Sequence, residues 1–160
     1  MLDVPLLIGG QSCPARDGRT FERRNPVTGE VVSRVAAATL EDADAAVAAA
    51  QAAFPAWAAL APNERRTRLL KAAEQLQARS DEFIAAAGET GAMANWYGFN
   101  VRLAANILRE AASMTTQITG DVIPSDVPGS FAMALRQPCG VVLGIAPVSY
   151  THLRPHDTVL

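Results

Sequence analysis

Few residues of this 160-residue chain could do chemistry. Neither of its two cysteines, Cys13 and Cys139, has a cationic neighbour in sequence that would favour a reactive thiolate. The two histidines, His152 and His156, stand four apart, but Pro155 between them disfavours the helix that would align them on a metal. No Ser-His-Asp order can be built from the residues before them. We therefore predict no catalytic residue and no metal site in this chain.

One helical segment gathers aromatic and amide side chains. Residues 95–100 read Asn-Trp-Tyr-Gly-Phe-Asn. These aromatic side chains could simply pack against neighbouring elements, as apolar helix stripes usually do. Alternatively, the segment forms the wall of an apolar channel that accepts a flat aromatic ligand. The residues of this predicted channel are Trp96, Phe99, Asn100 and Leu103. The sequence favours the packing interpretation and does not decide against the channel.

A small antiparallel β unit is expected to begin the chain. Leu6-Leu7-Ile8 is followed by Gly9-Gly10, a pair typical of a two-residue hairpin turn. Residues 20–23 and 31–35 alternate or run apolar as strands do, and Asn25-Pro26-Val27-Thr28-Gly29-Glu30 between them is typical of a turn. This unit would precede a helical region.

Local signals predict where the first helices begin and end. Thr39 with Asp42 three residues later indicates a capping box at the start of a helix. Pro55 is expected to end or kink that helix, because proline lacks the backbone N–H. Pro62 suits the first position of the next helix, where the missing N–H costs nothing.

The second half of the chain is expected to continue with helices and then strands. Ser80 is predicted to cap a short third helix, and a fourth is expected from about Ala92 to Thr116. Two strands, Val122-Ile123-Pro124 and residues 131–135, would form a hairpin. The apolar run 141–146 is typical of a central parallel strand covered on both faces.

Composition excludes several classes of protein. The chain is 49% hydrophobic and 19% charged, as expected for a globular domain rather than a disordered one. Its formal net charge of −2 gives no electrostatic reason to bind nucleic acid. We find no signal peptide and no apolar run long enough to span a membrane, so we expect a cytoplasmic protein.

Several runs of residues, in this order, resemble the NAD(P)-dependent aldehyde dehydrogenase superfamily, and residues 91–101 and 109–113 look most like its vanillin and salicylaldehyde dehydrogenases. The resemblance covers residues 6–147 and rests on Asn25-Pro26-Val27-Thr28-Gly29-Glu30, Phe54-Pro55-Ala56-Trp57, Pro62-Asn63-Glu64-Arg65-Arg66, Leu135-Arg136-Gln137-Pro138-Cys139-Gly140-Val141-Val142 and Gly144-Ile145-Ala146-Pro147. It implies an α/β fold: the N-terminal part of the family fold, with the β unit, a helical bundle, an oligomerisation-type hairpin at 121–137 and the first Rossmann-like strand.

The resemblance also implies an activity. Family members oxidise an aldehyde to a carboxylic acid and pass hydride to NAD or NADP, through a cysteine nucleophile and a glutamate general base. Only Ile145, Ala146 and Pro147 match positions beside the cofactor. Small-molecule aldehydes would be the substrates, and the parent enzyme would be a homodimer or homotetramer.

We expect a truncated fold. Residues 1–147 would be the N-terminal part of the cofactor-binding domain, and residues 148–160 a non-family tail. Val148 and Ser149 stand where the family has tryptophan and the oxyanion asparagine, and the nucleophile and general base would lie beyond the chain. We therefore predict a fragment that is inactive alone. The alternatives are a short helical interaction module and a fragment of a CoA-acylating semialdehyde dehydrogenase.

Overall fold

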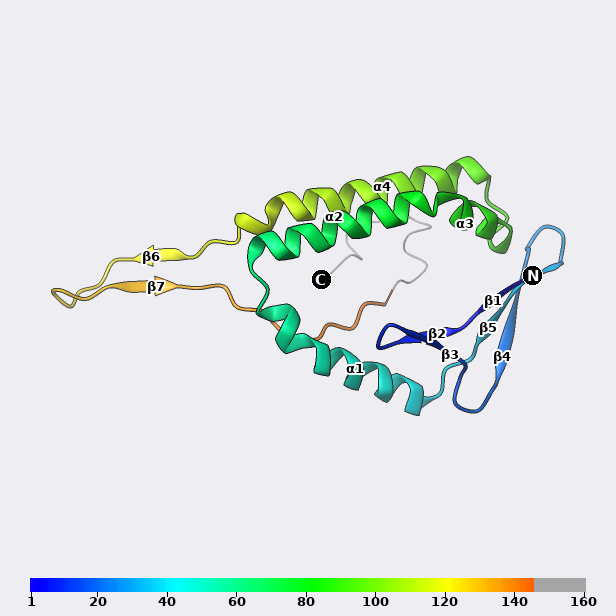
Figure 1. Ribbon diagram of the computed structural model, residues 1–160, viewed down its shortest axis with the longest axis horizontal. Helices are drawn as coiled ribbons and strands as arrows, with labels where there is room; N and C mark the ends of the chain where they lie inside the picture. Colours follow the sequence, from blue (N-terminus) through cyan, green and yellow to red (C-terminus); the bar gives the residue numbers. More distant parts are fainter. Residues whose placement is uncertain (146–160) are drawn as a thin grey trace.

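The computed structural model describes residues 1–145 and arranges them as a small sheet, a group of helices and a projecting hairpin (Figure 1). The sheet has the strand order β1-β5-β4, where β1 is Leu2–Val4, β4 is Thr20–Arg24 and β5 is Val31–Ala36. β4 pairs with β5 antiparallel, as expected, and β1 pairs with β5 parallel. The β unit is thus mixed rather than purely antiparallel, because β1 adds to the free edge of β5.

The Gly9-Gly10 hairpin is confirmed. β2 (Leu6–Ile8) pairs antiparallel with β3 (Gln11–Cys13). Both glycines have positive φ, +60° and +80°, the backbone that a type I′ turn requires at its two central positions. The turn predicted at residues 25–30 is likewise present between β4 and β5.

Helix α1 (Leu40–Ala58) begins with the predicted capping box. The Asp42 N–H donates to Thr39 Oγ1 at 3.2 Å, and the Thr39 N–H donates to Asp42 Oδ2 at 2.9 Å. The helix does not end at Pro55, one of the two expected outcomes, since it runs on to Ala58. Proline removes only its own N–H, and the Pro55 carbonyl still accepts a hydrogen bond from the Ala59 N–H at 3.1 Å.

Three further helices follow. α2 (Pro62–Ala78) begins at Pro62 as predicted, and α3 (Ser80–Ala85) leads into the short 3-10 helix η1 (Ala86–Glu89). Ser80 is not the cap of α3: Arg79 occupies that position, directly after α2, and no side chain caps the helix. α4 (Ala94–Ser113) continues into the 3-10 helix η2 (Met114–Thr116), close to the predicted 92–116.

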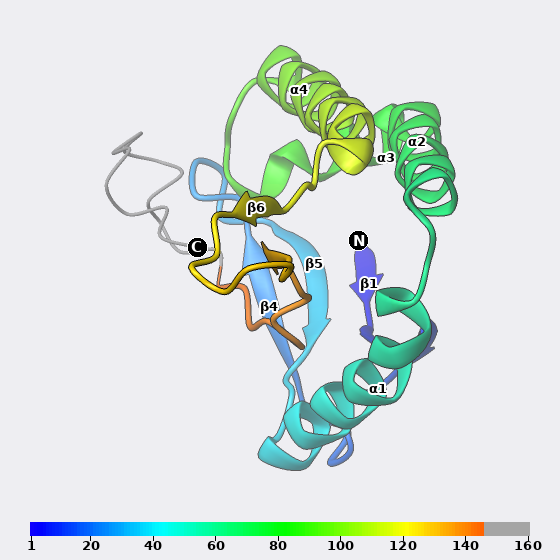
Figure 2. The ribbon, with the colours of Figure 1, turned by 90° about the vertical axis from the view of Figure 1, so that its left-hand side faces the viewer.

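Helices α2 and α4 lie side by side (Figures 1 and 2). Their most buried residues are small: Ala73 of α2, and Ala105 and Ala112 of α4. Arg66 joins the start of α2 to the end of α4, because its Nε donates to the Ala112 carbonyl at 3.1 Å. A guanidinium at the C-terminal end of a helix also complements the helix dipole.

The core of the described residues is small. Its buried hydrophobic residues are alanines and Val101, and the largest side chain that is fully buried belongs to Ser33. Many large apolar side chains remain exposed instead, Trp57, Phe83 and Trp96 among them. Large apolar side chains that are exposed together usually mark an interface or a ligand site. None of the helices in residues 1–145 is both long and apolar enough to cross a membrane.

The hairpin predicted at 121–137 is present, and its residues 121–135 extend away from the helices as an arm (Figure 1). β6 (Asp121–Ile123) pairs antiparallel with β7 (Ala132–Ala134). The expected strand at 141–146 is not formed in the described part of the chain, where residues 141–145 join no sheet. An apolar run becomes a strand only when another strand supplies its hydrogen bonds, and none lies beside it here.

Candidate functional site

The outward face of α4 carries a row of large apolar side chains. Trp96, Phe99, Leu103 and Ile107 recur at three- and four-residue spacing, which places them on one side of a helix. They are 51%, 46%, 44% and 59% exposed. Val101 and Ala105, which belong to the opposite side, are buried. We call these four exposed residues the outer row.

Two aromatic rings form the start of the outer row. The rings of Trp96 and Phe99 stack with centroids 5.7 Å apart and planes inclined by 26°. Asn100 Nδ2 donates to the Trp96 carbonyl at 2.8 Å, so that amide is held against its own helix. The Tyr97 hydroxyl lies 2.8 Å from Thr90 Oγ1 and ties the first turn of α4 to the preceding loop. The result is a fixed, uncharged aromatic surface.

The structure therefore brings together the residues of the predicted channel. Trp96, Phe99 and Asn100 are adjacent, and Leu103 follows one turn later. Packing accounts for only part of this surface, because the two rings contact each other and stay about half exposed. The channel itself stays a prediction. Ile107 extends the row and was not among the predicted channel residues, although its spacing of four from Leu103 was a visible signal.

The predicted cofactor residues do not form a dinucleotide site in the described part of the chain. Ile145 is 76% exposed and lies outside any sheet, and Ala146 and Pro147 lie outside the described residues. A Rossmann-type site needs a strand edge followed by a helix N-terminus. Residues 141–145 supply neither, so we derive no hydride-transfer step from this geometry.

Metal ligation finds no support in residues 1–145, where no three His, Cys, Asp or Glu side chains come together. His152 and His156 lie outside the described residues. Asp42 is the most buried carboxylate, and it serves the fold. The backbone N–H groups of Thr39 and Arg16, which donate to it, hold the pKa of this carboxyl below its usual range.

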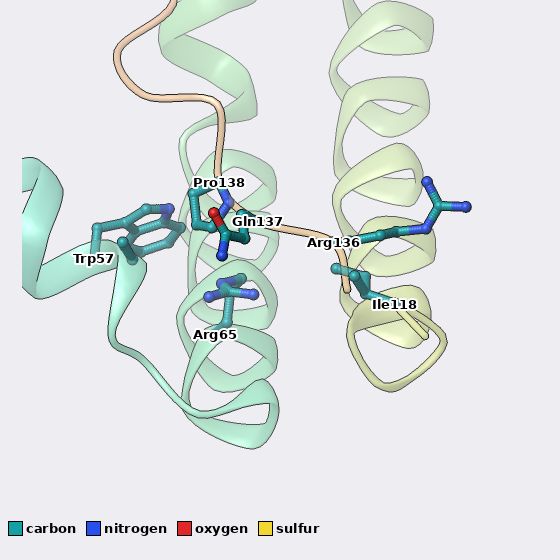
Figure 3. Close-up of a pocket in the computed structure, with 7 residues that line it drawn as sticks. Trp57, Arg65, Ile118, Arg136, Gln137 and Pro138 are labelled. Carbon is teal, nitrogen blue, oxygen red and sulfur yellow. The ribbon is translucent and has the colours of Figure 1, made fainter. Parts of the chain in front are cut away.

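A second feature is a cavity of about 430 Å³ at the base of the arm. Its lining comes from the end of α1, the first turn of α2 and the two chain segments that flank the hairpin; the residues are Trp57, Ala58, Arg65, Ile118, Arg136, Gln137 and Pro138. Figure 3 shows Trp57 and Arg65 beside Gln137 and Pro138, whereas the Arg136 side chain extends away from them. No pattern in the sequence indicated that Arg65 would line a cavity.

Comparison with known proteins places the chain in a family. Residues 14–156 match the profile of the Aldehyde dehydrogenase family. A vanillin dehydrogenase from Pseudomonas fluorescens is 94% identical over 147 residues, which are 92% of this chain and 30% of that protein. A salicylaldehyde dehydrogenase from Pseudomonas putida is 46% identical over 147 residues, 91% of this chain and 30% of that protein. The chain thus spans about 30% of the length of these relatives.

Solved structures agree. The structure of a salicylaldehyde dehydrogenase from Pseudomonas putida G7, complexed with salicylaldehyde, superimposes with a TM-score of 0.83 at 44% identity, over 86% of this chain and 29% of that one. An NAD-dependent benzaldehyde dehydrogenase from Corynebacterium glutamicum gives 0.71 at 32% identity, over 78% of this chain and 28% of that one. The α/β architecture described above is therefore that of the N-terminal part of such enzymes, and this chain belongs to the aldehyde dehydrogenase family.

Proposed function

We propose that this chain contributes to the oxidation of an aromatic aldehyde to its carboxylic acid, with NAD or NADP as hydride acceptor. Supporting this are its 94% identity to a vanillin dehydrogenase over 147 residues and its likeness to a salicylaldehyde dehydrogenase structure. The observation that carries the proposal is the outer row of α4, whose stacked Trp96 and Phe99 rings face outward from the helix pair.

The outer row would act as one wall of the aldehyde site. A flat aromatic substrate gains apolar contact from a ring already held in place, and an aromatic pair is worth about 1 kcal/mol beyond its buried area. The stack between Trp96 and Phe99 fixes the two rings before substrate arrives. Because the row is uncharged, it favours a neutral aldehyde over a charged carboxylate, which assists product departure.

The described residues supply binding rather than chemistry. We propose that the chain by itself does not oxidise aldehydes, because residues 1–145 form no dinucleotide site and the resemblance assigns the nucleophile to none of its cysteines. Absorbance at 340 nm, with purified chain, vanillin and NAD or NADP, checks this expectation. A rate of NADH or NADPH formation above the protein-free blank would contradict it.

The arm formed by β6 and β7 would serve assembly. Both outer edges of this two-stranded sheet are free in the described residues, and Val122, Phe131 and Leu135 on it are more than two-thirds exposed. Open strand edges with apolar side chains pair readily with another chain. We propose that this arm contacts a second copy in a homodimer or homotetramer. The cytoplasmic location and the absence of a nucleic-acid partner stay predictions.

A hybrid enzyme tests the proposed aldehyde wall. Residues 1–147 would replace the matching segment of the Pseudomonas fluorescens vanillin dehydrogenase, with which they share 94% identity. In this hybrid we expect Trp96→Ala to raise KM for vanillin about tenfold, since losing an aromatic wall costs roughly 1.4 kcal/mol of binding. KM for an aliphatic aldehyde such as butanal should change much less, because a small chain gains little from a flat ring.

Ala72→Leu is the matched control, because residue 72 is an exposed position of α2 and not of α4. It should leave both KM values within about twofold. Equal changes in KM for vanillin and butanal in the Trp96→Ala hybrid, or no change for either, would refute the aldehyde wall.

Neither the interaction module nor a CoA-acylating semialdehyde dehydrogenase is favoured, since the relatives above are named for aromatic aldehydes.

A further inference from the structure

The cavity at the base of the arm has the chemistry of a binding site in its own right. Its volume of about 430 Å³ falls in the range of small-molecule pockets, roughly 300–1,000 Å³. Much of the lining is apolar, from Trp57, Ala58, Ile118 and Pro138. The polar groups that face this surface belong to Arg65 and Gln137 (Figure 3).

The charge of the lining selects the ligand's charge. Of the two arginines in the lining, Arg65 lies beside Gln137 and Pro138 whereas the Arg136 side chain extends away from them (Figure 3), and none of the described lining residues is a carboxylate. Arg65 is half-buried, and its Nη2 donates to the Leu60 carbonyl at 3.2 Å, which fixes the guanidinium at the edge of the space. A guanidinium carries five N–H donors, so one such bond leaves a fork able to bind a carboxylate through two parallel hydrogen bonds.

The aromatic wall selects the ligand's shape. Trp57 comes from the last turn of α1, lines the cavity and is 45% exposed. Pro138 lies beside the indole, and the Gln137 side chain lies close to Arg65 (Figure 3). A flat ring can stack on an indole while its carboxylate reaches a guanidinium nearby.

We propose that this cavity binds a small aromatic carboxylate, with the ring against Trp57 and the carboxylate on Arg65. The site joins segments far apart in sequence: the α1–α2 corner, the residue that precedes the arm and the residues that follow it. A bound ligand would therefore fasten the base of the arm to the helices. The inference rests on the lining alone and is independent of the proposed function.

Fluorescence of Trp57 tests the site. The chain has two tryptophans, so a Trp96→Phe background leaves Trp57 as the sole indole. Benzoate, titrated into this 160-residue chain with excitation at about 295 nm, should change the emission of Trp57 saturably. Benzamide, which keeps the ring and loses the charge, should bind about tenfold more weakly, and acetate should give no saturable change.

Variants identify the group that binds the carboxylate. Arg65→Gln should weaken benzoate binding about tenfold, and Arg65→Lys about threefold, because lysine keeps the charge and loses the fork. Arg136→Gln is the matched control and should stay within about twofold, because the Arg136 side chain lines the cavity but extends away from Trp57 and Arg65, where we place the ligand (Figure 3).

Three results would overturn the proposal. The first is the absence of a saturable fluorescence change with benzoate, and a chain that aggregates counts as this result. The others are equal affinities for benzoate and benzamide, or equal losses of benzoate affinity in Arg65→Gln and Arg136→Gln. The readout does not involve the Trp96 and Phe99 wall, so the proposed function and this site can fail separately.

Discussion

The two faces of α4 differ in the size and the burial of their apolar residues. The inner face packs against α2 with small side chains, Ala105 and Ala112 among them, which are 0% and 1% exposed. The outer face carries Trp96, Phe99 and Ile107, which are about half exposed. The small residues let the two helices approach closely and hold this part of the fold, whereas the large ones are left for something else to cover.

The largest expected effect comes from overfilling the inner face. Ala105→Leu inserts three carbons into the packed α2–α4 interface and should destabilise the chain by about 3 kcal/mol. Urea unfolding followed by circular dichroism at 222 nm measures the loss. The control is Ala111→Leu on the exposed side of the same helix, expected to change stability by less than about 0.5 kcal/mol. Similar losses in the two variants would mean that the faces do not differ.

The next effect concerns the hydrogen bonds that join α2 to the end of α4. Arg66→Met removes the hydrogen bonds from the guanidinium to the carbonyls of Ala112 and Ser113 at 3.1 and 3.4 Å. We expect a loss of about 2 kcal/mol, the size typical of hydrogen bonds to charged groups. Arg68→Met, an exposed position on the same helix, should cost much less. The same urea titration compares the two variants. A loss of stability in Arg68→Met as large as that in Arg66→Met would refute the role of Arg66 in joining α2 to α4.

A pH effect extends the comparison to α1. Asp42 accepts hydrogen bonds from the N–H groups of Thr39 and Arg16, which lower its pKa below the value of about 4 expected in the unfolded chain. A carboxyl with a lowered folded-state pKa stabilises the fold above about pH 4, and this contribution is lost as the pH falls through the folded-state pKa. Unfolding free energy should therefore fall more steeply below pH 4 in the natural chain than in Asp42→Asn. Parallel pH profiles would contradict this.

The smallest effect on stability is expected on the outer face. Replacing Trp96 and Phe99 together by alanine removes their mutual stack, worth about 1 kcal/mol, and the contacts of two half-exposed side chains, a loss that the higher helix propensity of alanine partly offsets. The same substitution should lower the binding of an apolar fluorescent dye such as ANS, because it shrinks the exposed apolar surface. A loss of several kcal/mol would show instead that the outer row supports the fold.

Local signals in the sequence predicted local structure well. The Gly9-Gly10 turn and the box formed by Thr39 and Asp42 depend only on residues a few positions apart, and both are present. Pro55 does not end α1, because a helix can lose one N–H and continue when the later hydrogen bonds still form. Ser80 was misread for a different reason: α3 follows α2 so closely that Arg79 takes the capping position.

Features that depend on distant partners were harder to predict. The parallel pairing of β1 with β5 joins Leu2 to Ser33, and no local pattern indicates it. The apolar run at 141–145 has the composition of a strand, yet it forms none without a neighbour. For the site, helical spacing did predict that Trp96 and Leu103 share a face. Spacing could not tell which face of α4 would be buried, because apolar residues occur on both.

The most direct test combines stability and catalysis in one variant. Trp96→Ala with Phe99→Ala would be introduced into this chain, for urea unfolding, and into the hybrid vanillin dehydrogenase, for kinetics. If the outer row receives the aldehyde, the free energy of unfolding should fall by no more than about 1 kcal/mol while kcat/KM for vanillin falls at least about tenfold and that for butanal changes little. A large loss of stability with unchanged kcat/KM for vanillin would contradict the account and make the row a structural one.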